Sequence, residues 1–143
     1  EQMVDFGFVG DVDQCDGRML ATLIGEGVVP VMAPLTHDKQ GHLLNTNADS
    51  IAGETAKALA PYYDVTLIYS FEHAGVLTDP DDEASVIPHI TAESFEQLKA
   101  DGTVSGGMIP KIENALEAVK AGVKQVIITK ADAIDGKQGT LIS

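Results

Sequence analysis

Short apolar runs alternate with helical patterns along this chain, and that alternation limits its fold more than any other feature. We expect buried strands at 28–35 (VVPVMAPL), 64–70 (DVTLIYS) and 124–129 (KQVIIT), with shorter or interrupted strands at 3–12, 43–45 and 139–143. Helical patterns occupy 17–26, 48–59, 91–102 and 108–122. Strands that alternate with helices predict an α/β fold with a mostly parallel sheet and helices on both faces.

Size and charge narrow the class of protein. The 143 residues suit a single domain, and no linker divides residues 1–143. The formal net charge of −13 argues against a nucleic-acid or membrane-surface binder, because phosphate groups repel such a surface. The only cysteine, Cys15, lies among carboxylates (DVDQCDG) that would raise its pKa, so we expect no catalytic thiol. One cysteine and no membrane-spanning run favour a cytoplasmic location.

Polar residues crowd the point where a strand turns into a helix in LLNTNADSIAG. Asn45, Thr46, Asn47 and Asp49 occupy four of five positions there. Thr46 or Asn47 could cap the helix, and Asp49 could complement the helix dipole. Capping requires one such residue, whereas ligands bind beyond the carboxyl ends of parallel strands. We interpret the cluster as part of a binding site, with capping as the alternative for each single residue.

A second junction, SGGMIPKIENALEAVKAG, places a cation where it is electrostatically unfavourable. Lys111 lies in the first turn of the predicted helix and opposes the positive end of the helix dipole. Gly106 and Gly107 leave the preceding backbone open, so an anion shared with Lys111 would turn the conflict into a binding site. A solvated lysine is the alternative, and the Walker pattern is absent. Asp49 is the obvious carboxylate to orient Lys111.

Two other features favour ordinary surface structure. The acidic run TDPDDEAS (78–85) lacks the glycine and glutamate spacing of a calcium loop, which favours a solvated loop. The histidines follow no ligand spacing, so we expect no metal site built from them: His37, His42, His73 and His89.

Taken together, LLNTNADSIAG, GVLTDP, SGGMIPKIENALEAVKAGV and GTLI make the chain similar to the C-terminal half of acetylglutamate kinases, in the amino acid kinase family. The resemblance covers nearly the whole chain in the family's order. It implies a three-layer αβα sandwich with a mainly parallel central sheet, whose C-terminal half holds ATP. It also implies transfer of the γ-phosphoryl group to the side-chain carboxylate of N-acetyl-L-glutamate in arginine biosynthesis.

The resemblance also implies roles for individual residues. Lys111 and Asp49 would serve catalysis, with Lys111 stabilising the transferring phosphoryl group and Asp49 orienting Lys111. Asn45 and Asn47 would bind the acyl-amino-acid substrate. The nucleotide would be lined by Ser70, Phe71, Gly75, Val76, Leu77, Thr103, Val104, Ser105, Gly107 and Met108. Mg²⁺ would be held mainly by the nucleotide phosphates.

The chain departs from the family pattern in two respects. The family's N-terminal substrate lobe, with its glycine-rich lysine loop, has no counterpart in residues 1–143, and the turn from Ser70 to Gly75 is one residue longer. We therefore expect negligible kinase activity from this polypeptide alone, and an exposed sheet edge that favours homo-oligomers. N-succinylglutamate as the acceptor, or a nucleotide-binding module without catalysis, are the alternatives.

Overall fold

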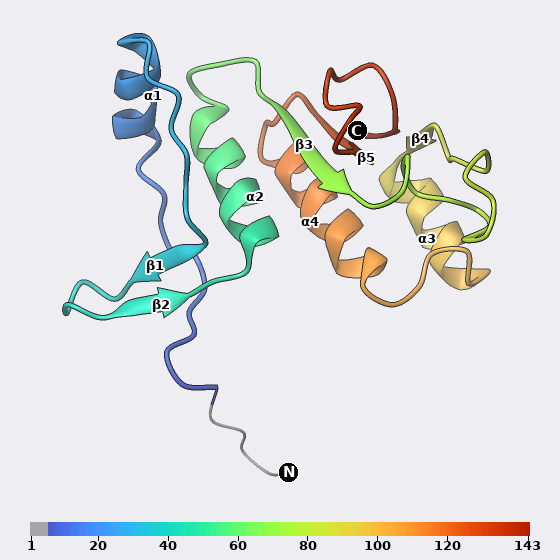
Figure 1. Ribbon diagram of the computed structural model, residues 1–143, viewed down its shortest axis with the longest axis horizontal. Helices are drawn as coiled ribbons and strands as arrows, with labels where there is room; N and C mark the ends of the chain where they lie inside the picture. Colours follow the sequence, from blue (N-terminus) through green and yellow to red (C-terminus); the bar gives the residue numbers. More distant parts are fainter. Residues whose placement is uncertain (1–5) are drawn as a thin grey trace.

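The computed structural model describes residues 6–143 and has the α/β architecture that the alternation predicts (Figure 1). Its elements in chain order are α1 (Gly17–Gly25), β1 (Leu35–His37), β2 (Leu43–Asn45), α2 (Ala48–Leu59), β3 (Thr66–Phe71), β4 (His89–Ile90), α3 (Ala92–Ala100), α4 (Met108–Lys120), β5 (Gln125–Lys130) and β6 (Thr140–Ile142). No helix among these residues is both long and apolar enough to cross a membrane.

The main sheet has four strands in the order β3-β5-β6-β4. Strands β3 and β5 run parallel, with Thr66 opposite Gln125 and Phe71 opposite Lys130. The β4–β6 pair is also parallel, and β5–β6 is antiparallel. A mainly parallel sheet is therefore confirmed. Strand β3 lies at one end of this order, and within residues 6–143 no strand pairs with its outer edge.

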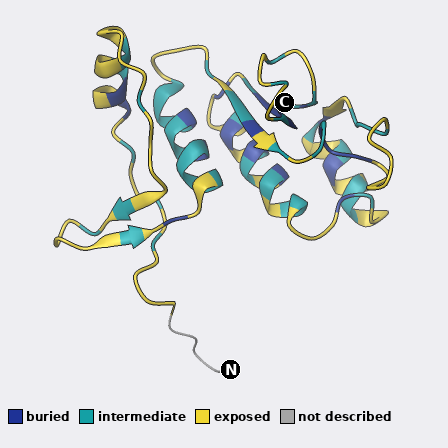
Figure 2. Ribbon diagram, viewed as in Figure 1, coloured by how far each residue is buried: buried dark blue, intermediate teal, exposed yellow. Residues whose placement is uncertain are grey.

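Helices α2 and α4 pack on one face of the sheet and form the core with it. Leu67, Tyr69 and Phe71 alternate along β3, so all three point to this face, as Val126 and Ile128 do on β5. Figure 2 shows the buried residues gathered where α4 meets the sheet and α3 joins it. The largest fully buried side chains include an aromatic ring and several isoleucines: Phe95, Ile90, Ile112, Ile128 and Ile142. Burying each side chain of this kind contributes about 1.5–3 kcal/mol.

The helix starts follow the local sequence. Asn47 caps α2 by accepting a hydrogen bond from the backbone N–H of Ser50. Thr91 and Ser94 form a reciprocal capping box at α3, as the sequence predicts for Thr91. Helix α4 begins after Gly107, which offers no side chain to cap it. The first turn of α4 therefore keeps more of its uncompensated positive potential than the other two starts do.

The buried strand expected at 28–35 is wrong. Val29 and Val31 are 83% and 94% exposed, and only Leu35 of this run enters a strand, the antiparallel pair β1–β2. Pro30 and Pro34 lack backbone N–H donors, which weakens any strand ladder through the segment. Among residues 6–143, nothing covers the apolar side chains that made it look like a central strand.

The strand expected at 3–12 is also wrong in its described part. Residues 3–5 lie outside the described residues. Of the rest, Val9 forms only an isolated parallel bridge to Asn45, and Phe8 accepts the backbone N–H of Asn45. This contact holds the N-terminal segment against β2 without extending the sheet of β3.

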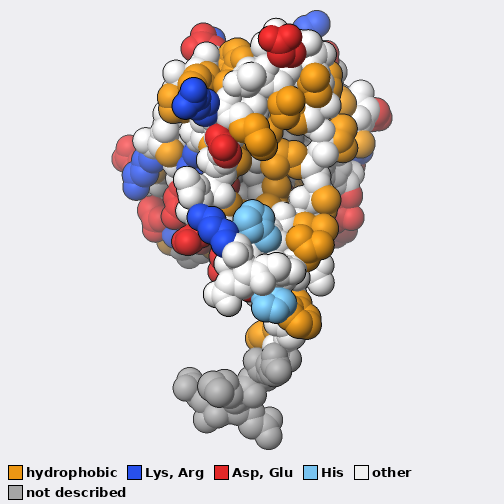
Figure 3. All heavy atoms as spheres, turned by 90° about the vertical axis from the view of Figure 1, so that its left-hand side faces the viewer, with side chains coloured by type: hydrophobic (Ala, Val, Ile, Leu, Met, Phe, Trp, Pro, Cys, Tyr) orange, Lys and Arg blue, Asp and Glu red, His pale blue; other side chains and the backbone are white. Residues whose placement is uncertain are grey.

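An apolar groove of about 440 Å³ lies between α1, the segment before β1, α2 and β3. Its walls include Leu20, Met32, Ile51 and Leu67. Figure 3 faces this side of the molecule and shows a band of hydrophobic side chains across it. Val65, just before β3, and Thr66 and Leu67, at its start, also line this groove.

Candidate functional site

The starts of α2 and α4 meet at an ion pair, although α2 follows strand β2 and α4 follows the loop after α3. Asp49 is the second residue of α2 and Lys111 the fourth of α4. The Lys111 Nζ atom donates to Asp49 Oδ2 over 2.6 Å, although the residues are 62 positions apart in the chain. The Lys111 side chain is 15% exposed and that of Asp49 36%, so the pair is partly shielded from solvent. The geometry that the sequence predicts for these two residues is present.

Two aromatic rings of β3 lie beneath this pair. The Lys111 ammonium is 4.9 Å from the ring centroid of Tyr69 and 5.9 Å from that of Phe71. The Tyr69 hydroxyl donates to the backbone carbonyl of Asp49 over 3.2 Å. Burial and, to a smaller extent, the negative charge of Asp49 together raise the pKa of Tyr69 to about 12. Tyr69 is therefore neutral at physiological pH and acts there as a hydrogen-bond donor.

The start of α4 is suited to an anion. Gly107 provides no capping side chain, and Lys111 adds a positive charge to the positive end of the helix. Asp49 offsets part of that charge through one carboxylate oxygen. An incoming phosphate group could contact the remaining ammonium protons and the glycine backbone at the same time.

A small pocket of about 150 Å³ lies between the loop after β3 and the loop before α4. It is lined by Phe71, His73, Gly75, Val76, Leu77, Pro80, Thr103, Val104, Ser105 and Met108. Eight of the ten residues that the sequence assigns to the nucleotide are among them; Ser70 and Gly107 are not. The volume is below the roughly 300–1,000 Å³ of whole ligand sites, so it suits one planar ring better than an entire nucleotide.

Gly75 is fixed by close packing in the wall of this pocket. A Cβ atom there would lie 2.7 Å from Thr140 Oγ1 and 2.9 Å from a methyl carbon of Val86. Thr140 Oγ1 accepts the backbone N–H of Val76 and donates to the carbonyl of Ile87. This buried threonine ties the pocket wall to β6. The backbone N–H of Val76 is therefore already hydrogen-bonded, and Val76 can touch a ligand only through van der Waals contact.

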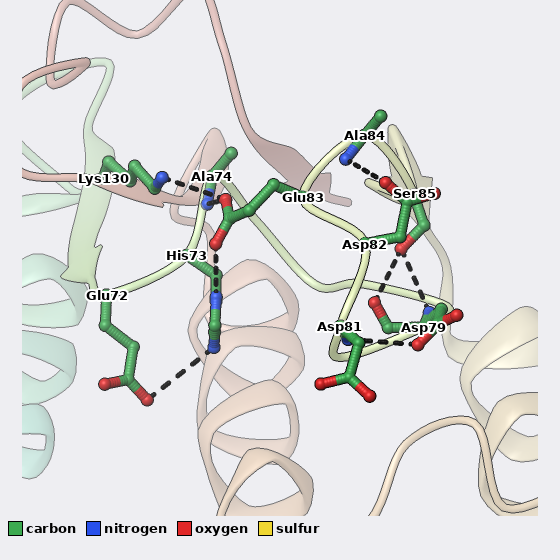
Figure 4. Close-up of polar contacts among 10 residues, drawn as sticks. All are labelled: Glu72, His73, Ala74, Asp79, Asp81, Asp82, Glu83, Ala84, Ser85 and Lys130. Atoms are coloured by element: carbon green, nitrogen blue, oxygen red, sulfur yellow. Dashed lines mark hydrogen bonds and ion pairs between the residues drawn. The ribbon is translucent and has the colours of Figure 1, made fainter.

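The carboxylate of Glu83 fastens the outer wall of the pocket (Figure 4). Its oxygens lie 2.7 Å from His73 Nδ1 and 2.9 Å from Lys130 Nζ, and one accepts the backbone N–H of Ala74 at 3.4 Å. His73 and then Lys130 lower the pKa of Glu83 to about 2. The acidic loop is exposed, as expected, and its Glu83 also contacts the segment after β3.

Sequence reasoning missed these wall residues for an identifiable reason. Pro80 lines the pocket and Glu83 braces it, yet both lie in a loop without periodic pattern. The one available signal was the density of carboxylates in 78–85 next to a lone basic residue of the preceding turn.

The first polar cluster divides into separate roles. Asn47 serves as the cap of α2, so its side-chain oxygen is engaged with Ser50. Thr46 is buried, and its hydroxyl is 2.8 Å from that of Thr36. Asn45 is exposed at the end of β2, and its side chain has no hydrogen-bond partner among residues 6–143. Asn45 and Asp49 are thus the members of the cluster that capping does not explain.

Burial raises the pKa of Cys15, and the nearby carboxylates of Asp16 and Glu54 raise it further, which disfavours a thiolate. Residues 6–143 contain no group of three or more histidine, cysteine, aspartate or glutamate side chains able to hold a metal ion.

Comparison with known proteins points to one family. The model of the amino acid kinase family matches residues 2–130. A curated acetylglutamate kinase from Bacteroides thetaiotaomicron is 63% identical over 139 residues, which are 97% of this chain and 54% of that protein. The acetylglutamate kinase of Phocaeicola vulgatus is 60% identical over the same shares. The chain therefore spans about half the length of the curated relatives it matches.

A solved structure supports the fold. The crystal structure of smu.665 from Streptococcus mutans UA159 superposes with a TM-score of 0.78 at 34% sequence identity. The match covers 99% of this chain and 55% of that protein. The same half-length coverage is thus found in a solved structure as in the curated relatives.

Proposed function

The chain belongs to the amino acid kinase family, and we propose that it forms the ATP-binding C-terminal lobe of an acetylglutamate kinase. The proposed reaction transfers the γ-phosphoryl group of ATP to the side-chain carboxylate of N-acetyl-L-glutamate, a step of arginine biosynthesis. The names of the most similar curated relatives support this choice. Because the chain spans about half of those relatives, the proposal assigns the rest of the acyl-glutamate site to a separate substrate lobe.

The observation that carries the proposal is the Lys111–Asp49 pair beside the small pocket. Phe71 lines that pocket and also lies 5.9 Å from the Lys111 ammonium. A base bound in the pocket would therefore direct its phosphates past Phe71 toward Lys111. Phosphoryl transfer depends on positioning and on neutralising the charge that develops on the phosphoryl oxygens. Lys111 would neutralise that charge, and Asp49 would hold its ammonium in place.

Asn45 is the better candidate of the two asparagines for the acyl-amino-acid substrate. Its side chain is exposed at the end of β2, whereas the oxygen of Asn47 already caps α2. An amide can donate to a carboxylate or an acyl carbonyl, both of which N-acetyl-L-glutamate and N-succinylglutamate contain. The acetyl compound is preferred here because it is the substrate that the relatives' name implies.

Mg²⁺ would arrive with the nucleotide. The described residues do not fit a protein cage for the ion, because no three suitable side chains converge and Asp49 is engaged by Lys111. Mg²⁺ commonly keeps several waters and binds through substrate phosphates. The single cysteine in the sequence keeps the cytoplasm as the proposed location.

Calorimetric titration of ATP into the protein tests the proposal. Lys111→Ala should weaken ATP binding by roughly tenfold or more, because hydrogen bonds to charged groups contribute about 1.5–3 kcal/mol. Lys124→Ala is the matched control, since Lys124 pairs with Asp64 at the other end of β3 and β5, where both side chains are largely exposed. It should leave ATP affinity unchanged.

The outcomes separate the alternatives. Absence of ATP binding by the wild-type chain, or equal effects of the two lysine variants, would refute a nucleotide site at Lys111. Binding alone fits both a kinase lobe and a non-catalytic nucleotide module. A coupled assay then decides between them: phosphorylation of N-acetyl-L-glutamate should be negligible with the 143-residue chain and should appear when a relative's substrate lobe is supplied.

A further inference from the structure

Tyr69 contacts both members of the Lys111–Asp49 pair. The residue lies in β3, is 4% exposed, and points to the face that α2 and α4 cover. Its hydroxyl donates to the backbone carbonyl of Asp49 over 3.2 Å. Its ring centroid is 4.9 Å from the Lys111 ammonium. One side chain therefore reaches the first turn of α2 and the first turn of α4 at once.

The ring offers Lys111 a favourable surface. An aromatic face attracts a cation within about 6 Å of its centroid, and the attraction grows when the cation is shielded from water. Lys111 meets both conditions, since its side chain is 15% exposed. Four-carbon lysine chains are flexible, so a surface that favours one ammonium position restricts the directions in which Lys111 can point.

The Tyr69 hydroxyl makes a polar contact that core packing does not require. A phenylalanine would fill the same volume without bringing a polar group into the interior, where an unpaired hydroxyl costs free energy. Tyr69 instead directs its hydroxyl to the carbonyl of Asp49, the residue whose carboxylate binds Lys111. The hydroxyl also packs beside Gly53, one turn further along α2, where a Cβ would lie at an ordinary contact distance of 3.4 Å.

We propose that Tyr69 is a positioning residue that sets the direction of the Lys111 ammonium toward the terminal phosphates of the bound nucleotide. The inference rests on the proposed nucleotide site. Tyr69 touches neither the pocket nor the substrate in this account; it acts through Lys111 and through the start of α2. Its removal should therefore affect the part of nucleotide affinity that Lys111 supplies and spare the part that the pocket supplies.

The experiment compares dissociation constants for ATP and AMP by calorimetry. AMP lacks the β- and γ-phosphates, so it reports on binding without the terminal phosphates that Lys111 would contact. Tyr69→Leu should reduce the preference for ATP over AMP by roughly three- to tenfold, since the aromatic face is lost. Tyr69→Phe keeps the ring and should reduce it roughly two- to fivefold through the lost hydroxyl contact. AMP affinity should stay within about twofold of the wild-type value in both variants.

A matched control uses another tyrosine hydroxyl bonded to a backbone carbonyl. Tyr63→Phe removes a 3.2 Å hydrogen bond to the carbonyl of Ala21, far from Lys111 in the fold. It should leave both affinities unchanged. Circular dichroism confirms folding of each variant, and Tyr69→Phe decides the question if Tyr69→Leu does not fold.

The decisive comparison is a double-mutant cycle with Lys111→Ala. Once Lys111 is absent, Tyr69→Phe should no longer change the ratio of ATP to AMP affinity. Equal losses for ATP and AMP, or the same loss with and without Lys111, would assign Tyr69 to core packing and overturn the inference. If the wild-type chain itself shows no preference for ATP over AMP, the proposed phosphate contact of Lys111 fails, and the role of Tyr69 fails with it.

Discussion

Replacing Asp49 by asparagine isolates the charge of the ion pair from the shape of the side chain. Asp49→Asn keeps the volume of the residue and its place in the first turn of α2. It removes the negative charge that lies 2.6 Å from Lys111 Nζ. The ammonium is then left partly desolvated, over aromatic rings and at the positive end of α4, without its counter-charge.

The magnitude follows from the burial of the pair. Exposed ion pairs contribute about 0–1 kcal/mol, whereas breaking a fully buried pair costs about 3–5 kcal/mol. The exposures of 15% for Lys111 and 36% for Asp49 place this pair between those limits. We expect Asp49→Asn to lower the free energy of unfolding by about 1–2 kcal/mol, which for a chain of this size lowers Tm by about 3–6 °C.

Thermal unfolding followed by circular dichroism measures this loss of Tm. A second substitution tests whether the unpaired charge of Lys111 causes it. Lys111→Met in the Asp49→Asn background removes the unpaired charge and should recover most of the lost Tm. Asp64→Asn is the control, because its pair with Lys124 spans 3.2 Å at 86% and 59% exposure. Equal Tm values for the Asp49→Asn and Asp64→Asn proteins would show that solvent already screens the Lys111–Asp49 pair.

Two further substitutions test the walls of the pocket. Gly75→Ala should abolish most nucleotide binding and lower Tm, because its Cβ would lie 2.7 Å from Thr140 Oγ1. The control Gly25→Ala should do neither, because its Cβ would have no neighbour within 4 Å. The pKa of Glu83 is held at about 2 by His73 and Lys130, so this carboxylate stabilises the fold above its ordinary pKa of about 4.3 and loses that contribution as pH falls toward 2. Urea unfolding between pH 7 and pH 2.5 should therefore show that the free energy of unfolding falls less with acid in Glu83→Gln than in the wild type. The control Asp81→Asn should lose as much as the wild type. An equal loss in Glu83→Gln and the wild type would refute the contact.

Local chemistry allowed much of the fold to be predicted. The bounds expected for α2 agree with those observed, because a capping residue, an apolar spacing and a following turn all act within a few residues. The capping box of α3 and the glycine that follows α4 are likewise signals that act within a few residues. The strand expected at 28–35 was wrong because an apolar run does not say what would cover it, and Val29 and Val31 are exposed in the described chain.

The site was predictable where its geometry depends on topology. Asp49 and Lys111 each lie in the first turn of a helix that packs on the same face of the sheet, so the packing of α2 against α4 brings the two side chains together. Tyr69 was not recognised, since a tyrosine in an apolar strand looks like core until its hydroxyl partner is known. Glu83 and His73 lie in aperiodic loops, whose path depends on contacts that no spacing in the sequence encodes.

The exposed apolar segment before β1 has a consequence for how the polypeptide behaves in solution. Apolar surface around Val29 and Val31 favours contact between molecules, while the formal charge of −13 keeps them apart. Only the second of these forces is screened by ions, since the Debye length falls from about 30 Å at 0.01 M to about 3 Å at 1 M ionic strength. Colloidal stability of the isolated chain is therefore electrostatic in origin, and added salt shifts the balance toward precipitation.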